Sequence, residues 1–256
     1  MSALLVEMRN ISKTFGAVTA LQDVSLRVPH AGVVGLVGDN AAGKSTLMKI
    51  LAGALARDKG DILIDGAPAS YTHPIGAREA GIEMIYQDFA LVPDLTVAQN
   101  IFLGRELTRR RAGLTVLDKR AMNDRARELF GALGLRIPSV TLPVQSLSGG
   151  QQQAVAIARA TGFDAKLVIM DEPTANLGAP AIAKVRETIA RLKASGVAVV
   201  IISHRLEDIF AIGDSIVVMK QGRLVAERAI GDTDNADVVE MIVTGRDPRL
   251  AATVSA

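Results

Sequence analysis

The chain has 256 residues, with 29 Lys and Arg, 27 Asp and Glu, no Cys and a formal net charge of +2. So small an excess of positive charge argues against a nucleic-acid partner, and the lack of Cys excludes a disulfide scaffold or a thiolate metal site. The longest apolar runs, such as "VAVVII" (197–202), are too short to cross a bilayer, and "MSALLVEMRN" (1–10) lacks the pattern of a secretion signal. We find no internal repeat, so the chain suits one large domain or a core with a small lobe.

The chain opens with two segments in which apolar and polar residues alternate. These are "LLVEMRNISKTF" (4–15) and "TALQDVSLRV" (19–28). Such alternation predicts antiparallel strands with one face in water, and "DILIDG" (61–66) predicts one more strand of the same layer. His30 and His73 lie in turn-like contexts and are interpreted as exposed loop residues.

A phosphate-binding loop follows the first apolar strand. "GVVGLV" (32–37) predicts a buried parallel strand, "GDNAAGKST" (38–46) matches the pattern G-x-x-x-x-G-K-[ST], and "STLMKILAGAL" (45–55) predicts a helix. Gly38 and Gly43 let the backbone wrap around phosphate oxygens, Lys44 places an ammonium on the outer phosphates, and Ser45 offers a hydroxyl to Mg²⁺. The order of strand, loop and helix favours ATP as the ligand.

Ala41 occupies a loop position where glycine is common. If the loop is to curl around a phosphate, Ala41 must adopt a left-handed or otherwise sparsely populated backbone conformation. For alanine this conformation costs about 1–2 kcal/mol. We expect a handicap for ATP binding and no loss of it.

Further strands alternate with helices along the rest of the chain. Apolar runs at 81–87, 166–172, 197–204 and 215–220 predict a mostly parallel sheet covered by helices. The stretch 96–134 has helical periodicity, many charges and no strand candidate, which predicts an α-helical lobe inserted into the core. Its basic run "RELTRRR" (105–111) is interpreted as a solvated face of the lobe, or as a contact for lipid headgroups or a permease.

Two more segments carry candidate chemistry. "LVIMDEP" ends a strand with two carboxylates, for which we predict a magnesium role at Asp171 and a role in activating water at Glu172; the alternative is an acidic pair that caps a helix. "LSGGQQQAVAIARA" (147–160) places Ser148 and two glycines before a helix, which predicts a second anion-binding helix start. One ATP needs one phosphate loop, so this second start is expected to serve the ATP held by another copy of the chain.

These motifs resemble those of the ATP-binding cassette (ABC) proteins, whose signature is "LSGGQ" and whose other motifs occur here in the same order. The resemblance implies that Phe15 stacks on adenine, that Gln87 links Mg²⁺ to the transmembrane partner and that His204 is the switch histidine; "TANLG" (174–178) resembles the loop after the catalytic acid. Catalytic roles fall on Glu172, His204 and Gln87. The implied nucleotide-binding residues are Phe15, Gly38, Asp39, Asn40, Ala41, Ala42, Gly43, Lys44, Ser45, Thr46, Ser148, Gly149, Gly150 and Gln151, and the implied Mg²⁺ ligands are Ser45, Gln87 and Asp171.

The implied fold is α/β: a phosphate-loop NTPase core with a mostly parallel sheet, an antiparallel β layer and an inserted α-helical lobe. One ABC ATPase domain would cover residues 1–256, with the antiparallel layer and phosphate loop at about 1–95, the lobe at about 96–160, the second half of the core at about 161–245 and a tail at 246–256. Ala41, Ala42, Gln152 and Asn176 depart from the commonest family pattern, but none of these departures removes a charged catalytic group.

The run from 87 to 106, with "AVAIARA" and "ISHRLEDIF", is similar to the cassette subunits of bacterial monosaccharide importers of the ribose, xylose and fructose type. This implies an ATP-hydrolysing subunit with ATP and Mg²⁺ as cofactors. It would be peripheral at the cytoplasmic face of the inner membrane and would energise sugar import through a separate transmembrane permease fed by a periplasmic sugar-binding protein. Two chains would form a homodimer around two ATPs. The alternatives are the ATPase of another ABC transporter, which shares this chemistry, and a soluble nucleic-acid-associated ABC ATPase, which would need coiled-coil insertions or a second cassette.

Overall fold

A six-stranded sheet forms the centre of the molecule. The computed structural model describes residues 3–175 and 177–249. The strand order is β12-β11-β3-β10-β9-β6, and every neighbouring pair is parallel except β11 with β12. The strands are β3 (Val33–Gly38), β6 (Ile82–Ile85), β9 (Leu167–Asp171), β10 (Ala198–Ile202), β11 (Ser215–Lys220) and β12 (Arg223–Ala229). The predicted mostly parallel sheet is therefore confirmed.

An antiparallel sheet packs beside this core. Its order is β2-β1-β4-β5, formed by β1 (Leu4–Phe15), β2 (Val18–Pro29), β4 (Lys59–Ile64) and β5 (Ala67–Pro68). Along β1, the buried side chains of Val6 and Met8 point to one face and polar ones to the other, as the alternation in the sequence predicts. The predicted antiparallel layer is therefore confirmed as well.

The central sheet is buried on both faces. Along β3, Val33 and Val37 pack into one apolar cluster, whereas Val34 and Leu36 pack into another. Side chains alternate across a strand, so the inner strands β3, β9 and β10 must be apolar on both faces, whereas the edge strand β12 carries exposed polar side chains. Gly35 lies where a Cβ atom would come within 2.2 Å of Cγ2 of Ile209, which lets the helix after β10 approach the sheet closely.

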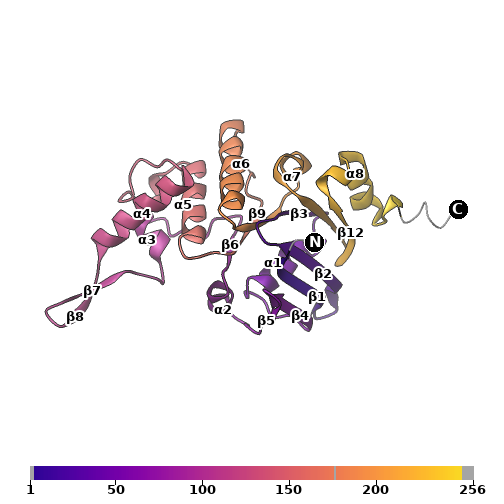
Figure 1. Ribbon diagram of the computed structural model, residues 1–256, viewed down its shortest axis with the longest axis horizontal. Helices are drawn as coiled ribbons and strands as arrows, with labels where there is room; N and C mark the ends of the chain where they lie inside the picture. The colour runs from indigo at the N-terminus through magenta and orange to yellow at the C-terminus, as the bar shows by residue number, and fades with distance from the viewer. Residues whose placement is uncertain (1–2, 176, 250–256) are drawn as a thin grey trace.

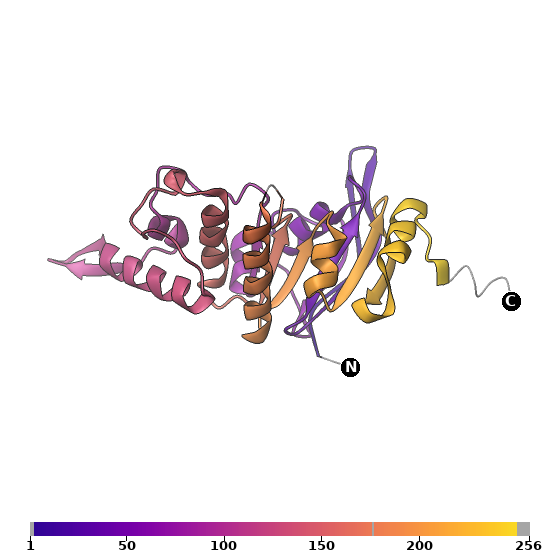
Figure 2. The same cartoon turned by 90° about the horizontal axis from the view of Figure 1, so that it is seen from above.

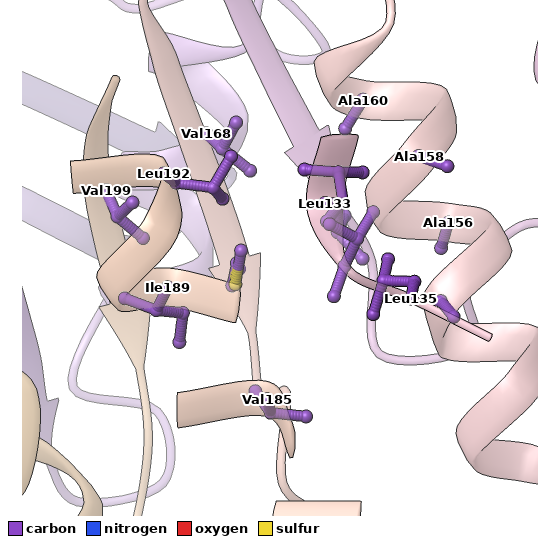
Figure 3. Close-up of a cluster of buried hydrophobic side chains, with 14 of the residues drawn as sticks. Leu133, Leu135, Ala156, Ala158, Ala160, Val168, Val185, Ile189, Leu192 and Val199 are labelled. Carbon is purple, nitrogen blue, oxygen red and sulfur yellow. The ribbon is translucent and has the colours of Figure 1, made fainter. Parts of the chain in front are cut away.

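Helices cover the two faces unequally. Side chains of α1 and α2 lie in the cluster between the two sheets, and those of α5, α6, α7 and α8 lie in the cluster on the opposite face. Figure 3 shows Ile189 and Leu192 of α6 among the buried apolar side chains beside Val199 of β10. These helices are α1 (Lys44–Leu51), α2 (Pro74–Glu79), α5 (Gly149–Thr161), α6 (Ala179–Ala194), α7 (Leu206–Ile212) and α8 (Asn235–Thr244). Helix α1 ends at Leu51, earlier than predicted, because Gly53 turns the chain at a φ of 69°.

A helical lobe extends from the edge of the sheet at β6, and the lobe is formed by α3 (Val97–Phe102), α4 (Lys119–Leu133) and α5. Figures 1 and 2 show the lobe at one end of the molecule and α8 toward the other. The fold class predicted from the resemblance is confirmed. The proposed division at about residues 95, 160 and 245 stays a prediction, and the tail beyond residue 249 lies outside the described residues.

The prediction that residues 96–134 contain no strand is wrong. Strands β7 (Thr108–Arg111) and β8 (Leu114–Leu117) form an antiparallel hairpin between α3 and α4. The basic run therefore enters a strand and does not continue a helix. The turn Ala112-Gly113 has positive φ at both residues, which closes a two-residue hairpin loop despite the polar character of β7.

Among the helices of the described residues, none combines the length and the apolar character needed to span a bilayer.

Candidate nucleotide-binding site

The loop after β3 wraps around the side chain of Lys44. Lys44 is only 6% exposed, and its Nζ donates hydrogen bonds of 2.8 Å to the carbonyl oxygens of Gly38 and Asp39. Burial lowers the pKa of Lys44, while the nearby carboxylates of Glu172 and Asp171 act in the opposite direction. The loop thus holds a partly dehydrated ammonium at the start of α1, which also aims its positive end at this place.

The backbone of this loop requires unusual conformations. At Gly38, with φ 148°, a Cβ atom would meet the carbonyl oxygen of Met219 at 2.1 Å, and at Gly43, with φ 96°, it would meet that of Ala20 at 2.7 Å. Neither position accepts another residue without movement of the backbone. Ala41 has a φ of 64°, so its predicted left-handed conformation is confirmed. This conformation is accompanied by a hydrogen bond of 3.1 Å from the amide of Ala42 to the Asp39 carbonyl.

Two carboxylates enter the same region from the end of β9. β9 ends at Asp171, which lies opposite Ile202 in the parallel register of β9 and β10, and the amide of Glu172 donates to the Ile202 carbonyl at 2.9 Å. His204 follows β10 and lies beside Glu172, with its Nε2 3.1 Å from Oε1 and its amide 3.4 Å from Oε2. The His204 ring is not aligned for a hydrogen bond, so Oε1 is buried without a hydrogen-bond partner among the described residues. Glu172 also has a φ of 51°, which orients its side chain at a cost in strain.

Burial sets the protonation chemistry of this pair. It raises the pKa of Glu172, an effect that the charge of His204 opposes. It also raises the pKa of Asp171, against the hydrogen bond from Ser45 and the charges of Lys49 and Lys44. Both carboxylates are therefore stronger bases than free side chains of their type.

These residues surround a pocket of about 280 Å³. Its lining includes Glu172, the candidate water-activating acid, its neighbours Asp171 and His204, and most of the phosphate loop. The lining residues are Asn40, Ala41, Ala42, Gly43, Lys44, Ser45, Thr46, Gln87, Asp171, Glu172, Ile202 and His204. Gly38 and Asp39 line an adjoining pocket together with His204.

The remaining predicted site residues lie elsewhere. Ser148, Gly150 and Gln151 line a different pocket, of about 450 Å³, between α5 and α6, and among the described residues none lines both this pocket and the phosphate-loop pocket. Gly149 begins α5 and lines neither. Phe15 lies at the end of β1 and is 48% exposed, with the Nζ of Lys13 over one face of its ring at 5.5 Å from the centroid. Asn176 lies outside the described residues.

Sequence reasoning missed a half-buried arginine that contacts the segment after Gln87. Arg159, on α5, donates hydrogen bonds of 2.7 and 2.6 Å to the carbonyl oxygens of Phe89 and Ala90. Both residues have positive φ, 60° and 45°. The segment two residues after Gln87 is therefore strained, and the signature helix holds it in that conformation.

Two more polar residues connect the site to its surroundings. Gln153, buried on α5, donates through Nε2 to the carbonyl of Pro173, the residue after Glu172. Asp208, only 2% exposed, accepts from Thr174 Oγ1 at 2.6 Å and from Arg186 of α6 at 2.5 Å. No sequence signal marked them, because each acts through a partner at least 20 positions away.

Strand β3, the glycine-rich loop, α1 and the acidic end of β9 together define a phosphate-loop nucleotide-binding domain. The sequence profile of the ABC transporter family matches residues 21–175, and the chain belongs to this family.

Three named relatives match most of this chain, and two of them have nearly the same length. The chain is 42% identical over 240 residues to the xylose/arabinose import ATP-binding protein XylG of Sulfolobus acidocaldarius, covering 94% of each. It is 38% identical over 250 residues to the fructose import ATP-binding protein FrcA of Rhizobium meliloti, covering 95% of each. It is also 44% identical over 247 residues to the ribose import ATP-binding protein RbsA of Rhodopirellula baltica, but spans only 47% of that protein. The chain thus spans about half the length of its ribose-import relatives.

Solved structures have the same fold. MJ1267, an ATP-binding cassette of an ABC transporter, superposes with a TM-score of 0.80 at 26% identity, over 97% of this chain and 98% of MJ1267. The cassette MJ0796, in a dimeric post-hydrolysis state with ADP and Pi, gives a TM-score of 0.75 at 25% identity, over 88% and 98%.

We predict that Arg159→Met loosens the Gln87 segment. Methionine fills similar space but donates no hydrogen bond, so the left-handed backbone at Phe89 and Ala90 loses two charge-assisted contacts. Amide hydrogen exchange across 86–92 should become about tenfold faster or more. Arg127→Met, which removes an exposed ion pair on α4, serves as the control and should leave this exchange unchanged. Equal exchange in all three proteins would show that Arg159 does not hold the segment.

We predict that Glu172→Gln stabilises the fold at alkaline pH. A carboxyl group whose native pKa is raised stabilises the native state below its unfolded pKa, and this contribution is lost as the pH rises through the native pKa. The neutral amide avoids that loss, so the variant should melt above the wild type at about pH 8, by a margin that shrinks toward about pH 5. Thermal denaturation at both pH values measures it. The control is Glu187→Gln, since Lys184 and Arg191 lower the pKa of Glu187, and it should not raise the melting temperature.

Proposed function

We propose that the chain is the ATP-hydrolysing subunit of an importer for a monosaccharide. The observation that carries this proposal is the similarity, over at least 94% of both chains, to import ATP-binding proteins named for xylose and arabinose and for fructose. The pocket between the phosphate loop and the β9 acids supports the same chemistry, because it joins a phosphate-binding ammonium to two basic carboxylates.

The phosphates of ATP would lie against residues 38–46. Lys44 supplies a positive charge, the amides at the start of α1 supply donors, and the exposed ring of Phe15 offers a face for adenine. Mg²⁺ would be held by Ser45, Gln87 and Asp171, whose hydroxyl, amide and carboxylate oxygens are ligands that this ion accepts. Within the described residues no cluster of three or more His, Cys, Asp or Glu could hold a metal, so phosphate oxygens would complete the coordination. When bound, Mg²⁺ neutralises charge on the phosphates.

Glu172 is the proposed general base. Its side chain lines the pocket, where an attacking water would lie, and its raised pKa increases its ability to take the proton of that water. His204 lies against the same carboxylate and would position it.

The signature residues Ser148, Gly149, Gly150 and Gln151 would serve the ATP of a second copy. They lie at the start of α5, away from the phosphate-loop pocket of their own chain, with Gln151 Oε1 accepting from the Ser148 amide at 2.9 Å. The dimeric state of the MJ0796 cassette supports this arrangement. A homodimer that closes on ATP and reopens after hydrolysis would move the helical lobes.

The partners would be transmembrane permease subunits, which contact the chain near Gln87, and through them a periplasmic sugar-binding protein. The chain itself would be peripheral at the cytoplasmic face of the membrane. Sugar identity is determined by those partners, because the sugar does not pass through the ATPase subunit.

We predict that Glu172→Gln abolishes ATP turnover and retains ATP binding, because it removes the proton acceptor and leaves Lys44 and the loop intact. With saturating ATP and Mg²⁺ the variant should accumulate as a dimer in size-exclusion chromatography. Cells lacking the wild-type chain should lose uptake of one monosaccharide and regain it with the wild type but not with the variant. Normal uptake of every monosaccharide would contradict the proposed import function.

Ser148→Arg is the matched variant for the second half of the site. It should abolish turnover and dimerisation while ATP affinity of the monomer changes little, because Ser148 serves the nucleotide of the other chain. Equal losses of binding and turnover would place Ser148 in its own chain's site instead.

We predict that Ala41→Gly binds ATP up to about tenfold more tightly than the wild type. Glycine removes the Cβ penalty at a φ of 64°, and bound phosphates hold the loop in this curl, whereas we expect partial relaxation without them. The melting temperature without ligand should change little, since glycine also adds about 1 kcal/mol of chain entropy to the unfolded state. Calorimetric titration measures the affinity, with Ala42→Gly as a control at a position without positive φ. Unchanged or weaker affinity would show that position 41 is not strained in the bound form.

A further inference from the structure

The hairpin formed by β7, β8 and their turn, residues 108–117, is here called the basic hairpin. It projects from the helical lobe beyond α4 at the far end of the molecule, as Figures 1 and 2 show. Its base is closed by a hydrogen bond of 2.8 Å from the Asp118 amide to the Leu107 carbonyl, and Leu107 packs against the apolar cluster of the lobe. The hairpin is therefore anchored at its base and surrounded by solvent along its length.

The arginines of the basic hairpin have no acidic partners. Arg109, Arg110 and Arg111 are all exposed, and in the described part of the chain no carboxylate pairs with them. The arginines of α4 behave differently, because Arg125 pairs with Glu128 at 3.0 Å and Arg127 with Asp124 at 2.6 Å. The positive charge of the hairpin is thus not compensated within the chain.

More positive charge lies beside the base. Lys119 and Arg120 begin α4 and are exposed, which gives five basic side chains within residues 107–120. Of these five, Arg120 pairs with Asp124 at 3.9 Å, so four remain without an ion pair in the described part of the chain. The one carboxylate of this segment, Asp118, caps α4 by accepting from the Ala121 amide at 3.0 Å. Clusters of four to eight Lys and Arg are the sequence feature that binds anionic lipid surfaces.

Apolar side chains accompany the arginines on both faces. The register pairs Arg111 with Leu114 and Arg109 with Val116, so these four share one face, while Arg110 shares the other with Leu117. Leu114 is 69% exposed and Leu117 47% exposed. A two-stranded hairpin with both faces in water is marginally stable by itself, and a surface that covers exposed leucines would stabilise it.

We propose that the basic hairpin binds the anionic phospholipid headgroups of a membrane surface. A bilayer surface presents negative headgroups with an apolar acyl layer just beneath them. Arginine and leucine on both faces of the hairpin suit such a surface, which requires no shape-matched pocket. Long arginine side chains can reach phosphates while their stems and the leucines lie at the headgroup boundary. The inference rests on the proposed function only in that this function places the chain at a membrane. The headgroup contact would hold the lobe at the surface independently of the permease.

The test is sedimentation of the full-length chain with vesicles at low ionic strength. One vesicle type is pure phosphatidylcholine and the other contains about one-third phosphatidylglycerol. The wild type should bind the anionic vesicles and not the neutral ones. The triple variant Arg109→Gln, Arg110→Gln, Arg111→Gln should bind the anionic vesicles more weakly, on the order of 100-fold, since each arginine near such a surface strengthens adsorption about fivefold.

The matched control is Arg125→Gln, Arg127→Gln, Lys184→Gln, which removes the same charge from side chains already paired with carboxylates. It should bind anionic vesicles within about twofold of the wild type, because paired charges attract the surface little. Equal weakening in both triple variants would assign binding to net charge and overturn the proposal. So would wild-type binding that is absent or equal for the two vesicle types.

A protein partner gives a different pattern. If the hairpin variant binds anionic vesicles normally but fails to co-purify with its permease, the surface is a permease contact and the lipid proposal is wrong. ATP hydrolysis in solution, measured on the same proteins, tests the proposed function separately. A wild type that binds anionic vesicles through the hairpin but does not hydrolyse ATP would sustain this inference and contradict the proposed enzyme.

Discussion

Opposite charges held together in a partly dehydrated pocket are the interaction on which the rest of the structure depends. Lys44 follows the loop after β3, and the carboxylates of Asp171 and Glu172 lie at the end of β9. These two strands flank β10 in the parallel sheet. Burial lowers the pKa of the lysine and raises that of both acids, so each charge is only partly compensated by the others. Such a pocket favours a ligand that brings phosphate oxygens to the ammonium and a cation to the carboxylates.

Helix α5 connects this pocket to the helical lobe. Its first turn carries the signature, Gln153 reaches the carbonyl after Glu172, and Arg159 holds the backbone after Gln87. One helix thus contacts two loops of the site. On the other side, Asp208 connects Thr174, in the loop after Glu172, to α6 and α7. A displacement of α5 would therefore change its hydrogen bonds both to the residue after Glu172 and to the backbone after Gln87 of the same chain.

The sequence predicts the repeating parts of this molecule well and its long-range contacts poorly. Alternation predicted the antiparallel layer, continuous apolar runs predicted the parallel strands, and the stereochemistry of a loop curled around phosphate predicted the left-handed Ala41. The basic hairpin escaped prediction because β7 consists of polar residues, and a strand without an apolar face has no period-2 pattern. Arg159, Gln153 and Asp208 escaped because their partners lie 20 to 70 positions away in the chain and meet them only once the sheet has formed. The roles assigned to the individual site residues stay predictions.

Each of the three loops that surround the pocket contains strained backbone, and together they hold four of the eleven non-glycine residues with positive φ in the described part of the chain. Ala41, Phe89, Ala90 and Glu172 all have positive φ although none is glycine, and each lies in the phosphate loop, the segment after Gln87 or the end of β9. Conformations of this kind persist only where neighbouring contacts enforce them. At Phe89 and Ala90 two hydrogen bonds come from Arg159, on the lobe, in addition to the local bond from the Phe89 amide to the Tyr86 carbonyl. At Ala41 and Glu172 the hydrogen bonds come from the core. The segment after Gln87 is thus the strained loop of the pocket to which the lobe donates hydrogen bonds directly. Loss of the two hydrogen bonds from Arg159 would remove the direct contact between the lobe and this strained backbone, so the segment after Gln87 is expected to become more mobile.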